Sequence, residues 1–348
     1  MNNPGQKDSD RMLSIVLAPF SWLYGAVMRI RNFLYDKGWK KSYSFDQAVI
    51  SVGNLSVGGT GKTPMIEYLV RLLSKEYSIA ILSRGYGRET KGFRLAGETD
   101  NASTVGDEPF QFYKKFSEKV VVAVCEDRVE GINRLLILKK SIQVILLDDA
   151  FQHRRVKPLF SILLTDFSKP FFRDYILPRG RLRESRKGSF GANVIVVTKC
   201  TSLTREIELN YKNEIQAHSG DKPVFFSAIG YSKPISLGNT QIYQDVVLVT
   251  GIANSKPLVD HVSEKINLRH HFNFGDHHVY STKEVDEIQQ KALTLNASIL
   301  TTEKDFVKLE QTLDKNLWFY LPIETRFINS GSEFDKMVVD KIKSYLKN

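Results

Sequence analysis

Short apolar, β-branched runs alternate with longer stretches of helical character along the chain after residue 45. Runs such as Ala48–Gly53 and Val144–Leu147 are almost entirely apolar, which is typical of strands buried on both faces. Strands that alternate with helices such as Gly61–Ser74 favour an α/β fold, a parallel sheet with helices on both faces. The other predicted strands are Ser78–Ser83, Val120–Val124, Ser161–Thr165 and Val194–Thr198, and the other helices are Asp107–Phe116, Glu126–Lys139 and Thr204–His218.

A second alternating series begins after a β-rich stretch at Lys222–Ile229 and a polar segment that ends near Asn239. We place a domain junction there, since a chain of 348 residues fits about two domains. The predicted parts are an N-terminal helical segment (1–41), a large α/β domain (42–221), a β-linker (222–244) and a smaller α/β domain (245–348). The last part is predicted to contain strands at Val246–Thr250, Ser298–Thr301 and Leu317–Leu321, and helices near Pro257–Lys265, Thr282–Leu295 and Glu333–Leu346.

An uncharged run at Met12–Met28 contains Pro19 and Gly25. It is shorter than the ~20 apolar residues that a spanning helix needs, and no clear cleavage site follows it, as a signal peptide would require. Two interpretations remain open: a helix lying in the headgroup plane of an anionic bilayer, or a helix packed on its own domain. Aromatic rings and cations are interleaved in and after the run, at Trp22, Tyr24, Arg29, Arg31, Phe33, Tyr35, Lys37, Trp39, Lys40 and Lys41.

Composition narrows the class of protein. Hydrophobic residues make up 42% of the chain and charged residues 25%, which excludes a disordered chain, a collagen-like fibre and a polytopic membrane protein. The net charge of +10 suits an acidic partner, either a nucleic acid, an anionic lipid or a phosphorylated substrate. The two cysteines, Cys125 and Cys200, adjoin apolar runs, which indicates a reducing compartment rather than a disulfide framework.

The strongest local motif lies between the first strand and the first helix of the large domain. Its glycines allow backbone N–H groups to surround phosphate oxygens, and the helix N-terminus adds a positive dipole. Lys62 can reach the β- and γ-phosphates, and Thr63 offers a hydroxyl to Mg²⁺. The alternative is a glycine-rich turn without a ligand. The candidate nucleotide-binding residues are Ser56, which replaces the usual first glycine, Val57, Gly58, Gly59, Thr60, Gly61, Lys62 and Thr63.

Two acids, Asp148 and Asp149, follow a buried strand. Such a strand delivers a carboxylate to Mg²⁺ in nucleotide-binding proteins, although a solvated strand end has the same form. We count Thr63, Asp148, Asp149 and Glu108 as candidate metal ligands. The segment Thr198–Thr201 lacks the Asp of a guanine-recognition motif, so ATP is favoured over GTP as the nucleotide.

Several ordered segments together resemble the tetraacyldisaccharide 4'-kinase family of lipid A biosynthesis. The resemblance runs from about residue 12 to about 310, with local departures at Ala150, Arg179, Arg181 and Gly275. The segments that carry it are Gly53-Asn54, Val57–Pro64, Ser83–Arg88, Val105–Pro109, Asp148–His153, Leu177-Pro178, Leu182–Glu184, Thr250–Ala253, Phe274–His278 and Thr301–Asp305.

This resemblance implies a fold, a reaction and a location. The fold would be a P-loop kinase domain and a smaller α/β/α domain joined by a β-linker, with the active site between them. The enzyme would transfer the γ-phosphate of ATP, with Mg²⁺, to the 4'-hydroxyl of a tetraacyl glucosamine disaccharide 1-phosphate, giving lipid IVA. The N-terminal helix would hold it at the cytoplasmic face of the inner membrane, on an anionic surface. No nucleic acid is expected as a partner, and the oligomeric state stays open.

Asp107 is the candidate general base, because an alcohol acceptor must lose its proton. From the residues alone Asp107 could equally cap the helix that it opens. The resemblance implies that Asp107 pairs with His277, or less favourably His278, across the two domains, and that Lys62 assists catalysis. The candidate substrate contacts are Gln152, His153, Arg183, Glu184 and Arg84.

Three other interpretations are weighed against this one. A P-loop ATPase switch that binds a nucleic acid or protein partner agrees with the charge, but no nucleic-acid-binding signature supports it. A soluble small-molecule kinase leaves the aromatic, cationic N-terminus unexplained. A zinc site among the histidines of His270–His278 lacks a nearby cysteine and helix-face spacing.

Overall fold

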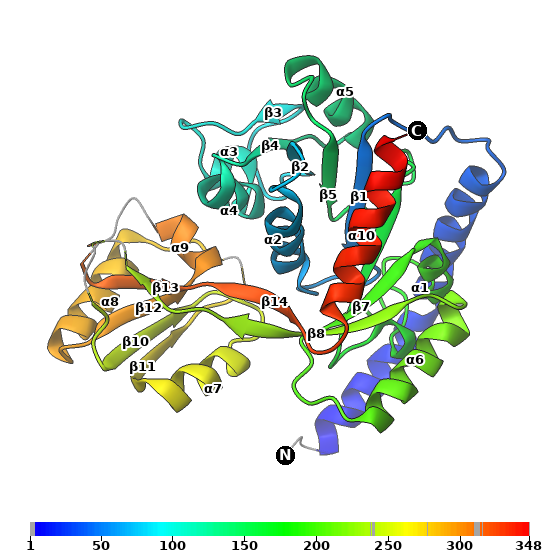
Figure 1. The fold of residues 1–348 in the computed structure, drawn as a ribbon. Helices are drawn as coiled ribbons and strands as arrows, with labels where there is room; N and C mark the ends of the chain where they lie inside the picture. Colours follow the sequence, from blue (N-terminus) through cyan, green and yellow to red (C-terminus); the bar gives the residue numbers. More distant parts are fainter. Residues whose placement is uncertain are drawn as a thin grey trace.

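The computed structural model describes residues 4–236, 238, 241–276, 278–309, 314 and 316–347, with the backbone alone for residues 4–14. These residues form two sheets with their flanking helices (Figure 1). We call the larger sheet and the elements packed on it the large body, and the smaller sheet and its helices the small body.

The large sheet contains nine strands within the described residues. They are β1 (Ala48–Asn54), β2 (Ile79–Ser83), β3 (Arg94–Leu95), β4 (Val120–Val124), β5 (Val144–Asp148), β6 (Phe160–Asp166), β7 (Val194–Thr198), β8 (Val224–Tyr231) and β14 (Ile323–Phe327). Their order is β14-β8-β7-β6-β1-β5-β2-β4-β3. All pairs from β8 to β4 are parallel, and β14 and β3 are antiparallel edge strands. The parallel sheet confirms the predicted α/β class.

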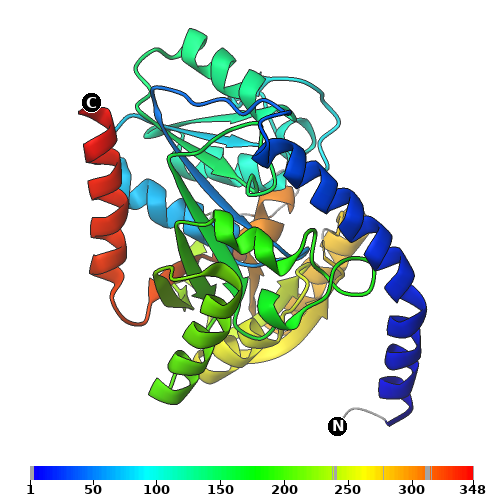
Figure 2. The same ribbon diagram turned by 90° about the vertical axis from the view of Figure 1, so that its right-hand side faces the viewer.

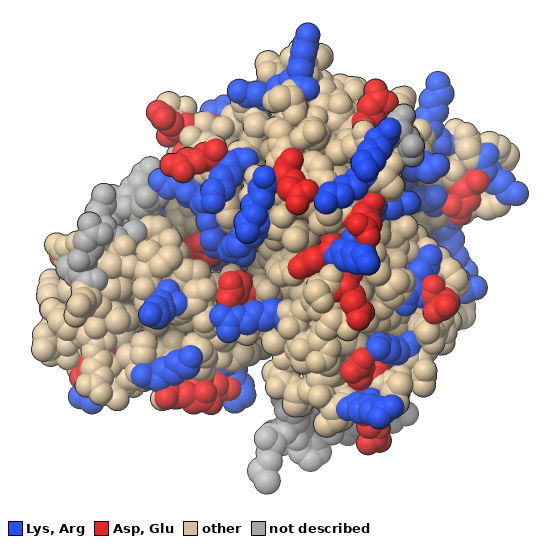
Figure 3. Space-filling view, in the orientation of Figure 1, with Lys and Arg blue, Asp and Glu red and all other residues tan. Residues whose placement is uncertain are grey.

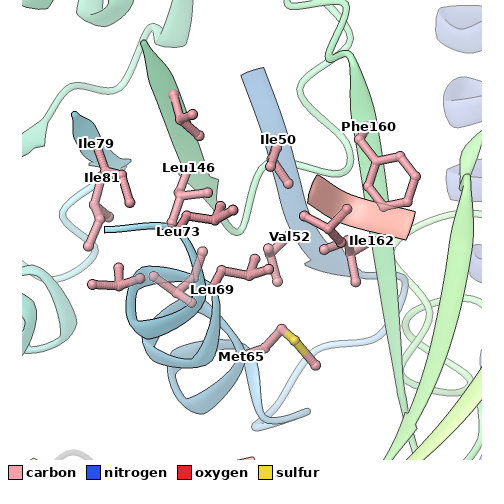
Figure 4. Packing of buried hydrophobic residues seen from close by; sticks show 14 of the residues in the cluster. Ile50, Val52, Met65, Leu69, Leu73, Ile79, Ile81, Leu146, Phe160 and Ile162 are labelled. Atoms are coloured by element: carbon pink, nitrogen blue, oxygen red, sulfur yellow. The ribbon is translucent and has the colours of Figure 1, made fainter. Parts of the chain in front are cut away.

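Helices cover both faces of this sheet, which explains why its central strands are apolar on both sides. In β1, Ile50 and Val52 pack against Met65, Leu69 and other residues of one helix (Figure 4). That face carries α2 (Lys62–Leu73), α4 (Asp107–Phe116) and α10 (Gly331–Leu346), whereas α5 (Arg128–Leu138), α6 (Arg205–Ser219) and two short 3₁₀ helices, η1 (Phe171–Arg173) and η2 (Arg186–Gly191), cover the other. A short helix, α3 (Ala102–Val105), precedes α4.

The small body has a five-stranded sheet within the described residues, in the order β11-β10-β12-β13-β9. The side chains of its strand β10 alternate between two helices: Val247 and Val249 pack with α8, and Val246 and Leu248 pack with α7. Its elements are β9 (Ile235–Ser236), β10 (Asp245–Thr250), β11 (Asn267–Asn273), β12 (Ser298–Thr302), β13 (Trp318–Leu321), α7 (Lys256–Lys265), α8 (Thr282–Thr294) and α9 (Glu303–Leu309).

The predicted division at residue 245 differs from this arrangement. Strand β14 pairs with β8 in the large sheet, and α10 buries Phe334, Val338 and Ile342 in the large-body core. The predicted linker is likewise divided, because β8 belongs to the large sheet and β9 to the small one. The chain therefore crosses between the bodies twice, through the antiparallel pair β8 and β14, and residues 245–348 do not form one unit.

Helix α1 (Pro4–Asp36) extends well beyond the predicted apolar run and contains Pro19. Figure 2 shows it lying across one side of the molecule, opposite α10, with its N-terminal end projecting past the rest. Its C-terminal half is attached through polar contacts: Asn32 donates to Glu184 Oε2 at 3.0 Å, and Arg154 pairs with Asp36 at 2.7 Å. Within the described chain no helix has both the length and the apolarity to cross a bilayer.

Candidate active site

The glycine-rich loop connects the carboxyl end of β1 to the start of α2. Gly58 and Gly61 have φ values of +102° and +83°, a region that residues with a side chain rarely adopt. A Cβ built at Gly58 or Gly59 would meet nothing within 4 Å, and both residues are exposed. The loop therefore bends around open space with the N-terminus of α2 facing it, as a phosphate-binding loop requires.

Contacts from neighbouring strands and loops hold this bend in place. The N–H of Val57 donates to the carbonyl of Arg181 at 2.8 Å, and Ser56 forms an isolated β-bridge with Leu182. Thr198 Oγ1 donates to the carbonyl of Thr60 at 2.9 Å. The loop conformation is thus set before any phosphate binds.

Lys62 points into the carboxyl edge of the sheet and is buried. Its Nζ lies 3.5 Å from Asn54 Oδ1 and 3.7 Å from Asp149 Oδ1. Arg183 Nη1 also contacts both carboxylate oxygens of Asp149, at 3.0 and 2.9 Å. One carboxylate therefore balances two cations beside the loop, and both cations could turn to an incoming anion.

Asp148, at the end of β5, is paired in register with Val52 of β1 and lies next to the loop. Its Oδ2 accepts a hydrogen bond of 2.9 Å from Ser83, whereas its Oδ1 is buried without a partner among the described residues. Burial, together with the neighbouring carboxylates of Glu108 and Asp149, raises the pKa of Asp148 to about 7. A cation at this place would favour the charged form and give Oδ1 a partner.

The oxygen atoms at this edge fit Mg²⁺. Thr63 Oγ1 donates to Glu108 Oε1 at 3.1 Å, so a hydroxyl and a second carboxylate adjoin Asp148. In the described part of the chain, no three His, Cys, Asp or Glu side chains come close enough to enclose a metal ion. Mg²⁺ in nucleotide sites is commonly held by one or two carboxylates together with water and phosphate oxygens, so the donor set suits that ion.

Two of the predicted substrate residues, Gln152 and Glu184, belong to one hydrogen-bond network that also includes residues of α1. Gln152 Nε2 donates to the carbonyl of Asn54 at 2.8 Å and to Glu184 Oε1 at 3.1 Å. The backbone carbonyl of Gln152 accepts from Arg31, and Glu184 accepts from Asn32, both on α1. This network connects α1 with the end of β1, next to the phosphate loop.

The remaining substrate candidates lie in different surroundings. His153 lines a cavity of about 800 Å³ between α1 and the sheet, and burial together with the charge of Arg128 lowers its pKa. Arg183 is paired with Asp149 beside the loop. Arg84 is exposed, and no hydrogen bond or ion pair joins it to another described residue. The structure therefore brings Arg183, but not Arg84, into contact with the acidic edge.

Asp107 opens α4 at the junction of the two bodies. Its Oδ2 lies 3.4 Å from Nζ of Lys308 on α9. The predicted partner His277 lies outside the described residues. The neighbouring His278 is directed elsewhere, because its Nε2 lies 3.1 Å from Glu284 Oε1 and its ring stacks on Phe274. His278 thus contacts Glu284 and Phe274 in this structure, and the pairing of Asp107 with a histidine stays a prediction.

Three described residues at the site were not among those predicted from the sequence. Asn54 contacts Lys62, Lys199 donates to the carbonyl of Gly59 and pairs with Asp166 at 3.0 Å, and Lys308 contacts Asp107. Asn54 ends the buried strand β1 and Lys199 directly follows the buried strand β7. The sequence could therefore have predicted that both residues lie at the carboxyl edge of the sheet. Lys308 lies on a short helix and no motif marks it.

Comparisons with known proteins agree with this geometry. The family model of the Tetraacyldisaccharide-1-P 4'-kinase (LpxK) matches residues 13–343. A relative named Tetraacyldisaccharide 4'-kinase from Flavobacterium psychrophilum is 46% identical over 95% of this chain and 98% of its own length. One of the same name from Flavobacterium johnsoniae is 46% identical over 97% and 99%.

A solved structure extends the likeness to three dimensions. LpxK from Aquifex aeolicus, crystallised in complex with ATP, is 30% identical and superimposes with a TM-score of 0.75, covering 95% of this chain and 99% of that one. Since the match covers 95% of the chain, it extends over both bodies. On these grounds the chain belongs to the tetraacyldisaccharide-1-phosphate 4'-kinase family, the ATP-dependent kinases of lipid A biosynthesis.

Proposed function

We propose that this kinase transfers the γ-phosphoryl group of ATP to the 4'-hydroxyl of a tetraacyl glucosamine disaccharide 1-phosphate, with the residues around the phosphate loop in the roles below. Relatives named Tetraacyldisaccharide 4'-kinase match the chain over almost its full length. The observation that carries the proposal is the open loop 56–63, beside which Lys62 and Asp148 lie, while Glu108, the neighbour of Asp107 on α4, accepts a hydrogen bond from Thr63 of the same loop.

The triphosphate would lie against the loop. Backbone N–H groups of Gly58 to Thr63 and the dipole of α2 would bind the β- and γ-phosphate oxygens. Lys62 would leave Asp149 for the phosphates, and Arg183 would then neutralise Asp149 alone. Asn54 Oδ1 and Asp149 Oδ1, at 3.5 and 3.7 Å from Nζ, already hold Lys62 beside the loop, so little side-chain reorganisation is needed.

Mg²⁺ would be held by Asp148 and the hydroxyl of Thr63, with Glu108 or Asp149 oriented toward its water molecules. The ion supplies charge neutralisation for the phosphoryl oxygens during transfer. The buried, unpartnered Oδ1 of Asp148 supports this assignment.

Asp107 would accept the proton of the 4'-hydroxyl. A carboxylate in hydrogen-bond reach of the acceptor increases its nucleophilicity as the bond to phosphorus forms. Asp107 lies at the junction of the bodies, so the acceptor sugar would enter between α4 and the phosphate loop. His277 is the proposed partner that orients Asp107.

Helix α1 would keep the enzyme on the cytoplasmic face of the inner membrane, where an acylated substrate is available. Its C-terminal half is tied to the large body, and the outward side is apolar, with Trp22 78% and Leu23 68% exposed. An exposed apolar stripe on a helix followed by cations suits the interface of an anionic bilayer.

The deciding experiment measures ATP turnover with Mg²⁺ in the presence and absence of detergent-dispersed acylated disaccharide 1-phosphate. We expect turnover only with the lipid, and we expect Lys62→Ala to remove both turnover and most ATP binding. ATP turnover that is indifferent to the lipid but stimulated by a nucleic acid would instead support a P-loop switch.

On the face drawn in Figure 3, basic and acidic side chains are interspersed and form no continuous basic band for a nucleic acid.

A further inference from the structure

Lys308 joins three elements that meet at the proposed base. It lies on α9 of the small body with its side chain 10% exposed. Its Nζ is 3.4 Å from Oδ2 of Asp107, at the start of α4 in the large body. The same ammonium donates to the backbone carbonyl of His278 at 3.3 Å. One cation thus connects the proposed base to the segment that carries the predicted histidine partner.

Helix α9 holds this ammonium firmly because it docks along α4 (Figure 1). Val307 is buried with Phe110 of α4 in one hydrophobic cluster. At the far end, Glu303 Oε1 lies 2.7 Å from Lys115 Nζ, near the end of α4. Lys308 meets the first residue of α4 and Glu303 meets its last turn, so the two helices run in opposite directions and are joined at both ends.

A second set of contacts secures the segment around His278. Lys304, one turn before Lys308, pairs with Asp276 at 2.8 Å. The ring of His278 stacks on Phe274 with 4.5 Å between centroids. Asp276 and His278 are therefore both attached to α9, and through Lys308 to Asp107.

We propose that Lys308 is a positioning residue for the phosphoryl transfer: its ammonium fixes the Asp107 carboxylate and the backbone at His278 relative to each other across the two bodies. An ammonium near a carboxylate restricts its rotation, and the hydrogen bond to the His278 carbonyl prevents the loop from withdrawing. The inference rests on the proposed role of Asp107 as base. A misplacement of reacting groups by about 1 Å can cost ~100-fold in rate.

The test is a double-mutant cycle with steady-state kinetics on the full-length enzyme, varying ATP and acylated disaccharide 1-phosphate separately. Lys308→Met should lower kcat about tenfold to a hundredfold and leave the KM for ATP almost unchanged. In an Asp107→Asn background the same change should lower kcat much less, because the group that Lys308 positions is already disabled. A merely structural lysine would give equal losses in both backgrounds, and that result would overturn the proposal.

Two further variants complete the design. Lys308→Gln keeps a donor for the His278 carbonyl without the charge, so it should lower kcat, but less than Lys308→Met does. Lys256→Met removes an 81% exposed lysine of α7 and serves as the control that should keep wild-type kinetics. A raised KM for ATP with unchanged kcat in Lys308→Gln would mean that Lys308 binds nucleotide, which also contradicts the inference.

Failure of the inference can be separated from failure of the proposed function. If Asp107→Asn loses activity while Lys308→Met and Lys308→Gln keep it, the result would support Asp107 as the base and contradict the positioning role of Lys308. If Asp107→Asn keeps activity, the proposed base is wrong and the role of Lys308 falls with it.

Discussion

At the scale of single residues, the site is defined by charges at the carboxyl edge of the large sheet, buried at Lys62 and Asp148 and half-buried at Asp149 and Arg183. Asp148 ends β5 and Asp149 follows it, and Lys62 and Arg183 share Asp149 between them. Charges in such a place are stabilised only while their partners are present. The same residues that bind ligand should therefore make the free protein sensitive to pH.

Asp148 should contribute a pH-dependent term to stability. Its pKa is about 7 in the folded protein and 3.8 as the ordinary value, so between these values the folded state binds the extra proton. The free energy of unfolding should therefore fall as pH rises through this window and level off above about 7. Denaturant unfolding without Mg²⁺ or nucleotide at about pH 5 and about pH 8 measures it.

Asp148→Asn supplies the control for this measurement, since an amide of the same shape does not titrate. The difference in unfolding free energy between wild type and Asp148→Asn should shift in favour of the variant as pH rises. A pH dependence that is the same in both proteins would show that Asp148 is not the group responsible.

Asp107→Asn should slow phosphoryl transfer by ~10²–10⁴-fold, the usual contribution of a positioned general base. ATP binding should survive, because the proposed phosphate contacts are Lys62 and the backbone N–H groups of the loop 56–63. Turnover assays with lipid and calorimetry with ATP measure the two quantities. A near-normal rate would exclude Asp107 as the base.

The sequence predicted these residues to the extent that a motif or a strand end marks them. Lys62, Thr63 and Asp148 follow from a glycine-rich turn and an acidic strand end, because the carboxyl ends of parallel strands meet at one edge. The pairing of Arg183 with Asp149 and of Lys308 with Asp107 depends on loops and helices from other parts of the chain. Neither side chain carries a local signal for its partner.

At the scale of elements, α1 combines the two interpretations that its sequence left open. Ser21 is buried and accepts from the N–H of Arg179 at 2.9 Å, while Phe20 and Trp22 on either side are exposed. The side of α1 that carries Ser21 therefore packs on the large body, whereas the side that carries Phe20 and Trp22 is exposed. The sequence did not predict this division, because apolar residues occur on all sides of the helix.

Substituting Trp22 and Leu23 with Glu should abolish flotation with anionic vesicles, because the exposed stripe would no longer enter the interface. The melting temperature should stay close to that of the wild type, since both side chains lie outside the core. Ile137→Glu with Leu138→Glu on α5 alters an equally exposed apolar pair, 73% and 57% exposed, and should leave flotation intact. Equal flotation of the Trp22/Leu23 variant and wild type would contradict membrane binding through this stripe and would indicate that α1 only packs on its own protein.

At the scale of the whole molecule, the two bodies are connected by both the chain and a buried ionic network. Lys115 Nζ lies 2.7 Å from Glu67 on α2 and 2.7 Å from Glu303 on α9. Burial and the nearby Glu67 raise the pKa of Glu303. Since α2 begins at the phosphate loop, the network connects that loop to the small body.

Lys115→Met should destabilise the protein by about 2–4 kcal/mol, because Glu67 and Glu303 would remain buried without their shared cation. Adding Glu303→Gln should recover part of this loss by removing one of the two charges. Unfolding free energies measure both effects, and Lys119→Met, an exposed lysine after α4, is the control. A loss for Lys115→Met no larger than for Lys119→Met would contradict the network's role.

The assembly of the bodies was the least predictable part of the fold. Strand β14 and helix α10 follow the small body in sequence but complete the large one. Periodicity identifies Glu333–Leu346 as a helix, yet its apolar face suits either core equally. The sheet that this helix covers is determined by contacts with residues hundreds of positions away in the sequence. The pattern of a single sequence does not predict such contacts.

The central claim, that the loop 56–63 holds ATP for transfer to the acylated disaccharide, is tested most directly by a single-turnover experiment. Enzyme in excess is mixed with ATP labelled in the γ-phosphate and with acylated disaccharide 1-phosphate, and the position of the label in the lipid is determined by phosphorus NMR and mass spectrometry. We expect the label on the 4'-oxygen with wild type and a greatly slowed transfer with Asp107→Asn. Label released as inorganic phosphate, or attached at another position, would contradict the account.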